Sequence, residues 1–192
     1  NVTGHLHDCA KTIRKTGGYI ITGAQVKELI KGADGSVQGA LIQDQGELME
    51  VRSKWTILAT GGFQGSPELR AERIHPNAKS IALRENPYSQ GDGIRLGLQA
   101  GAVWSGENHG FYGHLVCSPV NLNNNPSLYV RLAQWHSNHS LLFNIDGERF
   151  VDESKSDFYN SNMLVFQPNA RGVLVWDEYV QVEHILNTIV HG

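Results

Sequence analysis

The fold is decided by residues 55–63, WTILATGGF. Residues 55–60 form an apolar run that ends abruptly at Gly61 and Gly62. A run that is apolar throughout is typical of a strand buried on both faces of a parallel sheet. Glycine has no side chain to hold a ligand off, so the backbone here can approach a bound molecule closely. The stretch predicts an α/β protein whose buried strand ends at a ligand. The alternative is a plain strand-to-loop turn, because short glycine motifs are weak evidence.

An antiparallel three-stranded meander is predicted before this run. A helix over residues 4–16 precedes it, with Leu6, Ala10 and Ile13 at helical spacing and Gly17 and Gly18 at its end. The β-rich run at 19–22 is also expected to be extended. The strands of the meander are expected at 25–30, 37–44 and 47–53, with a turn at 33–36 between the first two.

Helix and strand signals continue after the glycines. Ser66 followed by Pro67 predicts a helix start, because serine caps a helix and proline suits its first position. A second helix is expected from Gly91 through Gln99, ended by Gly101. The later elements are strands at 141–145, 149–151 and 172–176 and a helix at 178–188.

The second of these helices opens on residues 90–94, QGDGI. A helix N-terminus presents free N–H groups and a partial positive charge, which suit a phosphate or a polarised carbonyl. Asp92 there can accept a hydrogen bond from a ligand hydroxyl. The alternative is that Asp92 simply caps the helix.

The composition excludes several classes of protein. The chain has 192 residues, 40% hydrophobic and 18% charged, which is enough apolar material for a core and argues against disorder. The net charge of −3 gives no reason to expect nucleic acid or an anionic membrane as partner. Cys9 and Cys117 are too few and too isolated for a disulfide framework or a zinc site. With no apolar run of membrane-spanning length and no secretory signal, we expect a reduced, cytoplasmic protein.

Three stretches together resemble one family: residues 51–78, VRSKWTILATGGFQGSPELRAERIHPNA, 88–102, YSQGDGIRLGLQAGA, and 144–154, NIDGERFVDES. The chain resembles the flavoproteins of the fumarate reductase and succinate dehydrogenase group, and within it the soluble branch of tricarballylate and ketosteroid dehydrogenases. The resemblance covers nearly the whole chain in the family's order. It implies an α/β fold with an α+β cap, in which residues 1–105 are the middle of an FAD-binding domain and 106–192 part of a substrate-capping domain.

The same resemblance implies which residues approach FAD. It places the backbone of Val26 at the adenine, although an ordinary sheet residue is the alternative there. The other cofactor-binding candidates are Ala59, Thr60, Gly61, Gly62, Gly91, Asp92 and Gly93. The dinucleotide fingerprint Gly-x-Gly-x-x-Gly does not occur in the sequence. We therefore expect an internal fragment that by itself binds FAD weakly or not at all, because most of the pyrophosphate cradle is missing.

The resemblance also implies the chemistry: hydride exchange between flavin N5 and a carbon–carbon bond next to a carboxylate or carbonyl of a small-molecule substrate. His109 and His114 lie where the family has a substrate-binding histidine, and imidazole suits that role near neutral pH. The alternative for each is a structural histidine. Fumarate reductases have a proton-delivering arginine shortly after the RFVDE-like segment, but here no arginine occurs between Arg149 and Arg171.

Asp157 and Tyr159 lie in the place of that arginine. Tyr159 is a candidate acid or anchor, with simple packing as the alternative.

His136 and His139 have a spacing that suits a metal, but no further ligand pattern supports one, so we expect none. The missing arginine leaves open a non-catalytic protein with a flavin fold. An NAD-binding dehydrogenase is a second rival, which the meander and the Gly-Asp-Gly spacing disfavour. The electron-transfer partner stays open.

Overall fold

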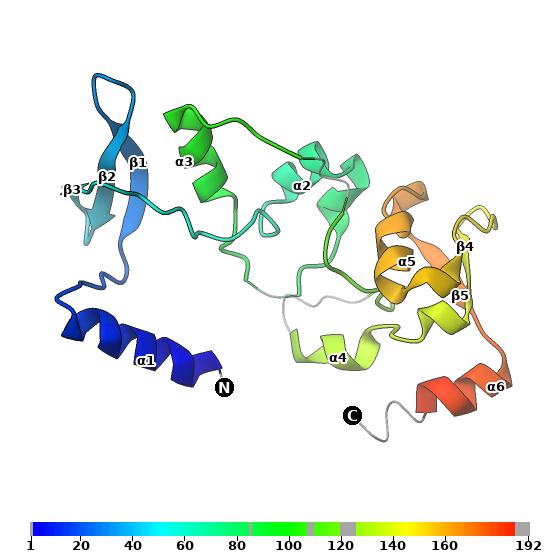
Figure 1. The fold of residues 1–192 in the computed structure, drawn as a ribbon. Helices are drawn as coiled ribbons and strands as arrows, with labels where there is room; N and C mark the ends of the chain where they lie inside the picture. Colours follow the sequence, from blue (N-terminus) through cyan, green and yellow to red (C-terminus); the bar gives the residue numbers. More distant parts are fainter. Residues whose placement is uncertain (1, 85, 107–109, 120–125, 187–192) are drawn as a thin grey trace. The chain divides into compact units, whose positions relative to one another are not determined.

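A computed structural model describes residues 2–84, 86–106, 110–119 and 126–186 of the chain (Figure 1). The chain divides into two compact units. Unit 1 comprises Asn1–Ala59 and Ile94–Trp104, and unit 2 comprises Thr60–Gly93 and Ser105–Gly192. Residues 60–93 therefore group with the later part of the chain. The assignment of residues 1–105 to the FAD-binding domain and of 106–192 to the cap stays a prediction.

Unit 1 contains helix α1 and a three-stranded sheet. Its elements are α1 Val2–Lys15, β1 Gln25–Lys31, β2 Val37–Asp44 and β3 Glu47–Arg52. The strand order is β1-β2-β3, and both pairings are antiparallel, with Leu29 opposite Ala40 and Ile42 opposite Met49. Ile42, on the central strand, is buried. The predicted helix and meander are confirmed.

Turn chemistry fixes the two hairpins of this sheet. Between β1 and β2, the Asp34 carboxylate accepts hydrogen bonds from the Ser36 hydroxyl at 2.7 Å and the Ser36 N–H at 3.0 Å. These bonds hold the pKa of Asp34 below its ordinary value. Between β2 and β3, Gln45 and Gly46 both have positive φ, 48° and 92°. That pair of left-handed residues is the turn that matches the twist of two antiparallel strands.

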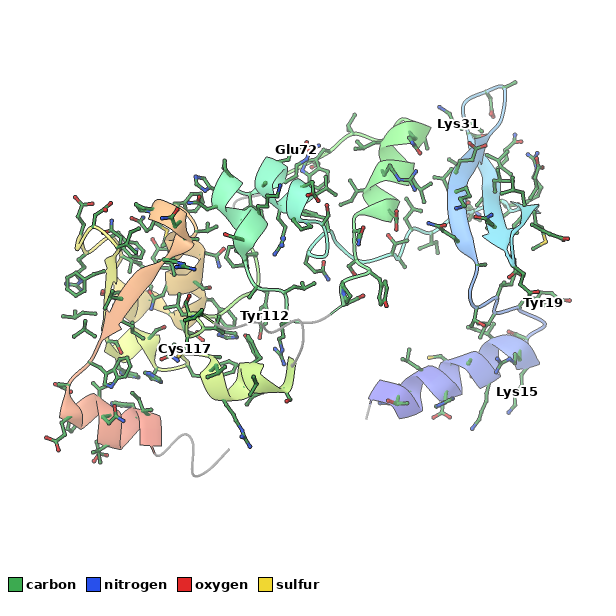
Figure 2. The ribbon with its side chains drawn as sticks, turned by 180° about the vertical axis from the view of Figure 1, so that it is seen from behind. Lys15, Tyr19, Lys31, Glu72, Tyr112 and Cys117 are labelled. Atoms are coloured by element: carbon green, nitrogen blue, oxygen red, sulfur yellow. The ribbon has the colours of Figure 1, made fainter. Side chains whose placement is uncertain are left out.

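Two predicted strands, at 55–60 and 149–151, are wrong. Residues 55–60 are irregular. The β-rich run at 19–22 also forms no strand, and Tyr19, labelled in Figure 2, is 92% exposed. Trp55 and Ile57 are each 87% exposed. Residues 55–60 are apolar, as a buried strand requires. A strand also needs a neighbouring segment to form hydrogen bonds with, and no described segment pairs with 55–60. In place of a strand at 149–151, the structure has one isolated β-bridge between Arg149 and Phe143.

Unit 2 is built from short elements. The Ser66 hydroxyl accepts a hydrogen bond from the Leu69 N–H at 3.2 Å and Pro67 is the first helical residue, as predicted. β4 and β5 pair antiparallel, with Leu142 opposite Leu174. The predicted last helix is a short α-helix continued by a π-helical turn, and residues 187–188 lie outside the described residues. The elements are α2 Pro67–Arg73, η1 Pro76–Ser80, α3 Asp92–Ala100 (continuing into unit 1), η3 Pro126–Leu128, α4 Tyr129–Leu132, η4 Ser137–His139, β4 Leu141–Asn144, η5 Glu153–Lys155, α5 Asp157–Leu164, η6 Pro168–Ala170, β5 Gly172–Val175, α6 Glu178–Val180 and η7 Gln181–Leu186.

A buried carboxylate joins β4 to the segment that follows it. The Glu153 side chain is 3% exposed. Its carboxylate accepts a hydrogen bond from Arg149 Nη2 at 2.6 Å and another from the Leu142 N–H at 2.7 Å. Burial alone would raise the pKa of Glu153, but the hydrogen bonds from Arg149 and Leu142 outweigh it and lower the pKa below its ordinary value. The charged form is therefore the one that the fold stabilises.

We predict that Glu153→Gln lowers the free energy of unfolding by about 1.5–3 kcal/mol, the usual range for hydrogen bonds to a charged group. Because the folded-state pKa is lowered, this stability is present above the ordinary pKa of 4.5 and is lost as the pH falls through the folded value. Urea denaturation between pH 7 and pH 3 measures both effects. Asp146→Asn, in the exposed turn after β4, is the control; equal losses in both variants would contradict the prediction.

Candidate active site

The two glycine motifs of the sequence meet in unit 2. The Gly91 N–H donates to the Gly62 carbonyl at 3.1 Å, so the turn after Thr60 lies against the start of α3. Just beyond it, the Gly65 N–H donates to the Ser89 carbonyl at 2.8 Å. The segments 60–65 and 89–93 are therefore joined by backbone hydrogen bonds, which we call the glycine junction.

Glycine is required at this junction for two physical reasons. Gly61 has a φ of +77°, which side-chain-bearing residues rarely adopt, and a Cβ there would lie 3.2 Å from the Ser89 hydroxyl. A Cβ at Gly93 would overlap the Thr60 hydroxyl. The close approach of Thr60 to α3 thus depends on Gly93, and the surface of the junction is backbone instead of side chain.

The remaining cofactor candidates lie in different settings. Val26 is a half-buried residue of β1 in unit 1, and its nearest ladder partner is Ile42. Ala59 is exposed and is the last residue of that unit's first segment. Asp92 is the acidic residue in the first turn of α3 and already interacts with other groups of the chain. Their contacts with a cofactor stay predictions.

A cavity of about 710 Å³ lies within unit 2. Its walls come from η1, from residues 111–119 and from the end of α5 to Arg171. Phe111, Leu115 and Leu164 are among its apolar residues, and His114 and Arg171 among its polar ones. Polar and apolar side chains line this cavity in similar measure, and a concave site with convergent polar groups is the usual place for a small molecule to bind.

His114 is the buried ionisable group of this cavity. Its side chain is 2% exposed, and Nδ1 lies 2.5 Å from Oδ2 of Asp157. The other ring nitrogen, Nε2, is buried and has no hydrogen-bond partner among the described residues. Figure 2 labels Tyr112 and Cys117, which bracket the segment that carries this histidine. A buried polar atom without a partner is costly, so Nε2 is the ring atom that is still able to make a hydrogen bond.

Aromatic rings enclose the imidazole. The ring centroids of Trp135 and Phe158 lie 4.2 Å and 4.5 Å from that of His114, and those of Tyr112 and Tyr129 lie at 5.6 Å and 5.9 Å. Burial raises the pKa of Tyr129, and the Arg84 guanidinium, 4.3 Å above its ring, acts in the opposite direction. Sequence reasoning missed these rings. Tyr112, two residues before His114, carried the one local signal; the others come from distant segments.

Tyr159 and His109 are the other two candidate catalytic residues. Tyr159 lies in α5 with the Lys155 ammonium 4.8 Å from its ring centre, and it is not among the residues that line the cavity. Its proposed role stays a prediction. His109 lies outside the described residues.

Three histidines gather near the end of the described chain. The rings of His139 and His184 stack at 3.9 Å, and His136 meets Trp176 edge-on. Burial lowers the pKa of His136, and the charges of His139 and His184 lower it further. Within the described part of the chain, no group of three His, Cys, Asp or Glu side chains that could hold a metal is found.

The comparisons with known proteins identify the family. A model of the FAD binding domain family matches residues 2–187. The chain belongs to this FAD-binding family. Vinyl phenol reductase of Lactiplantibacillus plantarum is 29% identical over 157 residues, which cover 78% of this chain and 31% of that protein. The fumarate reductase (cytochrome) of Shewanella frigidimarina is 25% identical over 160 residues, covering 80% of this chain and 26% of that protein.

Solved structures share the fold. A flavocytochrome c3 fumarate reductase in its open conformation matches with a TM-score of 0.62 and 20% identity, over 94% of this chain and 31% of that one. A 3-ketosteroid-Δ4-(5α)-dehydrogenase from Rhodococcus jostii matches with a TM-score of 0.67 and 20% identity, over 88% and 32%. The chain thus spans about a third or less of the length of its relatives. No described helix has the length and apolar character to cross a membrane.

In the glycine junction, Gly61 and Gly62 are exposed backbone that a dinucleotide could approach. Gly91 and Gly93 are buried, and Gly93 packs on the Thr60 hydroxyl. Thr60–Gly62 are therefore the junction residues that would hold part of a dinucleotide, and contacts of Gly91–Gly93 with it stay predictions. The family identification supports the resemblance seen in the sequence, including the mixed α/β fold class.

We predict that Gly93→Ala disrupts the glycine junction while Gly97→Ala does not. The first adds a methyl group against the Thr60 hydroxyl, whereas a Cβ at Gly97, in the same helix, meets Leu58 Cδ1 at an ordinary 3.6 Å. We expect Gly93→Ala to reduce flavin per protein in the full-length gene product, as measured by absorbance after gel filtration. Overpacking costs about 1–3 kcal/mol, so its melting temperature should fall too. Normal flavin content in Gly93→Ala would contradict the prediction.

The lowered pKa of His136 predicts a pH-dependent stability. The unfolded chain takes up the proton near the ordinary pKa of 6.5, whereas the folded chain does so at lower pH. Stability is therefore full above pH 6.5 and falls as the pH drops from there through the folded pKa. His136→Phe keeps a ring against Trp176 and should flatten the change in melting temperature between about pH 7.5 and 5.5. An unchanged slope in this variant would contradict the assignment.

Proposed function

We propose that this chain is part of an FAD-dependent oxidoreductase that transfers hydride to or from a carbon–carbon bond next to a carboxylate or carbonyl. His114 then moves the proton. The observation that carries the proposal is the buried His114 at the cavity, with Nδ1 on Asp157 and Nε2 unpartnered. The relatives named as fumarate reductase, vinyl phenol reductase and ketosteroid dehydrogenase support this class of reaction.

The proton chemistry follows from the two ring nitrogens. FAD, when bound, supplies the hydride acceptor or donor at its N5 atom. Removal or addition of hydride at one carbon requires a matching proton transfer at its neighbour. Because an ionised Asp157 can only accept a hydrogen bond, Nδ1 of His114 carries a proton and Nε2 is the atom that exchanges one. A neutral ring acts there as a base and a protonated ring as an acid.

Arg171 favours a carboxylate over a neutral carbonyl as the recognised group. It lines the same cavity as His114, and no described residue forms a salt bridge with its guanidinium. The two residues before it, Asn169 and Ala170, have φ values of 56° and 50°. Non-glycine residues in this region cost about 1–3 kcal/mol each and cluster at ligand-binding sites. Arg171 is exposed and borders the cavity, and a substrate carboxylate is the partner that a guanidinium in that place fits.

The alternative of a non-catalytic flavin-fold protein rested on the missing arginine. A buried histidine–aspartate pair and an arginine at one cavity supply the acid–base and anion-binding groups that such a protein would not need. Cytoplasmic localisation stays a prediction, and the identity of the electron donor or acceptor stays open.

We predict that His114→Ala lowers kcat by about 10²-fold or more, the usual effect of losing a general acid–base group. Flavin content should be unchanged, because the glycine junction does not involve His114. The assay uses the full-length gene product, reduced chemically, with a panel of α,β-unsaturated acids and enones. Wild-type turnover in His114→Ala would remove this residue from the mechanism. Inactivity of the wild type towards the whole panel would reject the proposed reaction.

Arg171→Gln should raise KM for unsaturated acids by about 10-fold or more, since a charge-assisted hydrogen bond contributes about 1.5–3 kcal/mol. The KM for neutral enones should change little. Arg131→Gln, at an exposed position of α4, is the matched control. An equal rise in KM for acids and enones would show that Arg171 does not recognise a carboxylate.

A further inference from the structure

We propose that Asp157 is a positioning residue: it fixes the tautomer and orientation of His114 so that Nε2 is the proton-transferring atom. This inference rests on the proposed function. In it, His114 and Asp157 together take the proton-transferring role of the arginine that the resemblance predicts between Arg149 and Arg171, where the sequence has none. The contact joins residues 43 apart in the chain, with Oδ2 of Asp157 2.5 Å from Nδ1 of His114. The Asp157 side chain is 17% exposed and that of His114 is 2% exposed.

The two oxygens of Asp157 have separate partners. Oδ1 accepts the N–H of Phe158 at 2.9 Å, which leaves Oδ2 for the histidine. The cap of α5 is supplied by another residue, since the Ser156 hydroxyl accepts the Tyr159 N–H at 3.1 Å. The carboxylate also lies in the first turn of the eight-residue α5, where the helix dipole favours a negative charge. Asp157 is therefore held with one oxygen directed at the imidazole and is not the residue that caps α5.

The segment that carries His114 is fixed to the same helix. The Asn162 side chain pairs with both backbone groups of Phe111, accepting its N–H at 2.9 Å and donating to its carbonyl at 2.9 Å. The Ser161 hydroxyl donates to the Gly113 carbonyl at 2.8 Å. Donor and acceptor of the pair thus sit on two segments that three further hydrogen bonds hold together.

The ring itself has little freedom to flip. Phe158, the residue after Asp157, packs on the imidazole at 4.5 Å, and Trp135 packs on it at 4.2 Å. A rotation that exchanged Nδ1 and Nε2 would break the bond to Asp157 inside this aromatic enclosure, where water is excluded. Asp157 therefore decides which nitrogen is available.

The direct readout is the tautomer of His114, observed by ¹⁵N NMR of the full-length flavoprotein with labelled histidine. His114→Gln assigns the signal. In the neutral ring of the wild type, we expect a protonated Nδ1 and an unprotonated Nε2. In Asp157→Asn the amide donates to Nδ1, so the proton should move to Nε2. A wild-type ring with the proton on Nε2, or an unchanged tautomer in Asp157→Asn, would overturn the proposal, and the wild-type measurement stands even if the variant does not fold.

The kinetic readout separates positioning from a structural role. Asp157→Asn should lower kcat by about 10²-fold or more, as in other enzymes whose histidine is held in the wrong tautomer, with KM and flavin content unchanged. Asp157→Glu, which keeps the carboxylate, should restore part of the activity. Asp152→Asn is the matched control, because Asp152 caps the neighbouring helical turn through Ser154. Equal kcat losses in Asp157→Asn and Asp152→Asn would overturn the positioning role.

Asp157 is the ionisable group in direct contact with the imidazole. The other groups that face His114 are Tyr112 from its own segment and Tyr129 from α4 with Arg84 above it; Arg171 lines the same cavity. A tautomer that behaves as expected in a protein inactive on every substrate would reject the proposed function and leave the positioning intact.

Discussion

The hydrogen bonds made by the polar side chains of α5 hold unit 2 together. Asn160, fully buried, donates to the Ser137 hydroxyl and to the Glu153 carbonyl, each at 3.2 Å. Ser161 and Asn162 bind the backbone of residues 111–113. A buried polar group left unsatisfied costs about 1–3 kcal/mol, more than the bond itself contributes. These bonds restrict the position of the helix, although Oδ1 of Asn160 has no hydrogen-bond partner among the described residues. That position brings Asp157 to His114.

This arrangement explains which features the sequence could predict. Ser66 before Pro67, the turn at 33–36 and the glycines around α3 act on neighbouring residues, so their patterns were sufficient. The contacts of α5 with residues 111–114 join positions 43 to 51 residues apart through single asparagine, serine and aspartate side chains. Such residues have no periodicity and are common on surfaces, so nothing local marks them as buried. The histidine was found by its place in the resemblance, but its partner was identified by geometry.

The strand predicted at 55–60, which the structure lacks, shows where a local sequence pattern is not sufficient. Its apolar residues satisfy the pattern of a buried strand, yet Ile57 is 87% exposed and no described segment pairs with it. A sheet is a property of at least two segments, and this chain spans about a third or less of the length of its relatives. A sequence pattern can therefore be correct about burial preference and still not describe the structure that these residues adopt.

Asn77 connects the glycine junction with the cavity. The chain leaves Gly62, passes through α2 and enters η1, where the Asn77 amide donates to the carbonyls of Val165 at 3.1 Å and Gln167 at 2.8 Å. Buried Arg70 fixes the same stretch by donating to the carbonyl of Ile81 at 2.6 Å. The segment that follows the candidate cofactor residues thus ends on the C-terminal side of the helix whose first residue binds His114. The hydride transfer that we propose would need its reacting atoms to be about 3–3.5 Å apart. Fixed hydrogen bonds at both ends of α5 are the kind of support that such a distance demands.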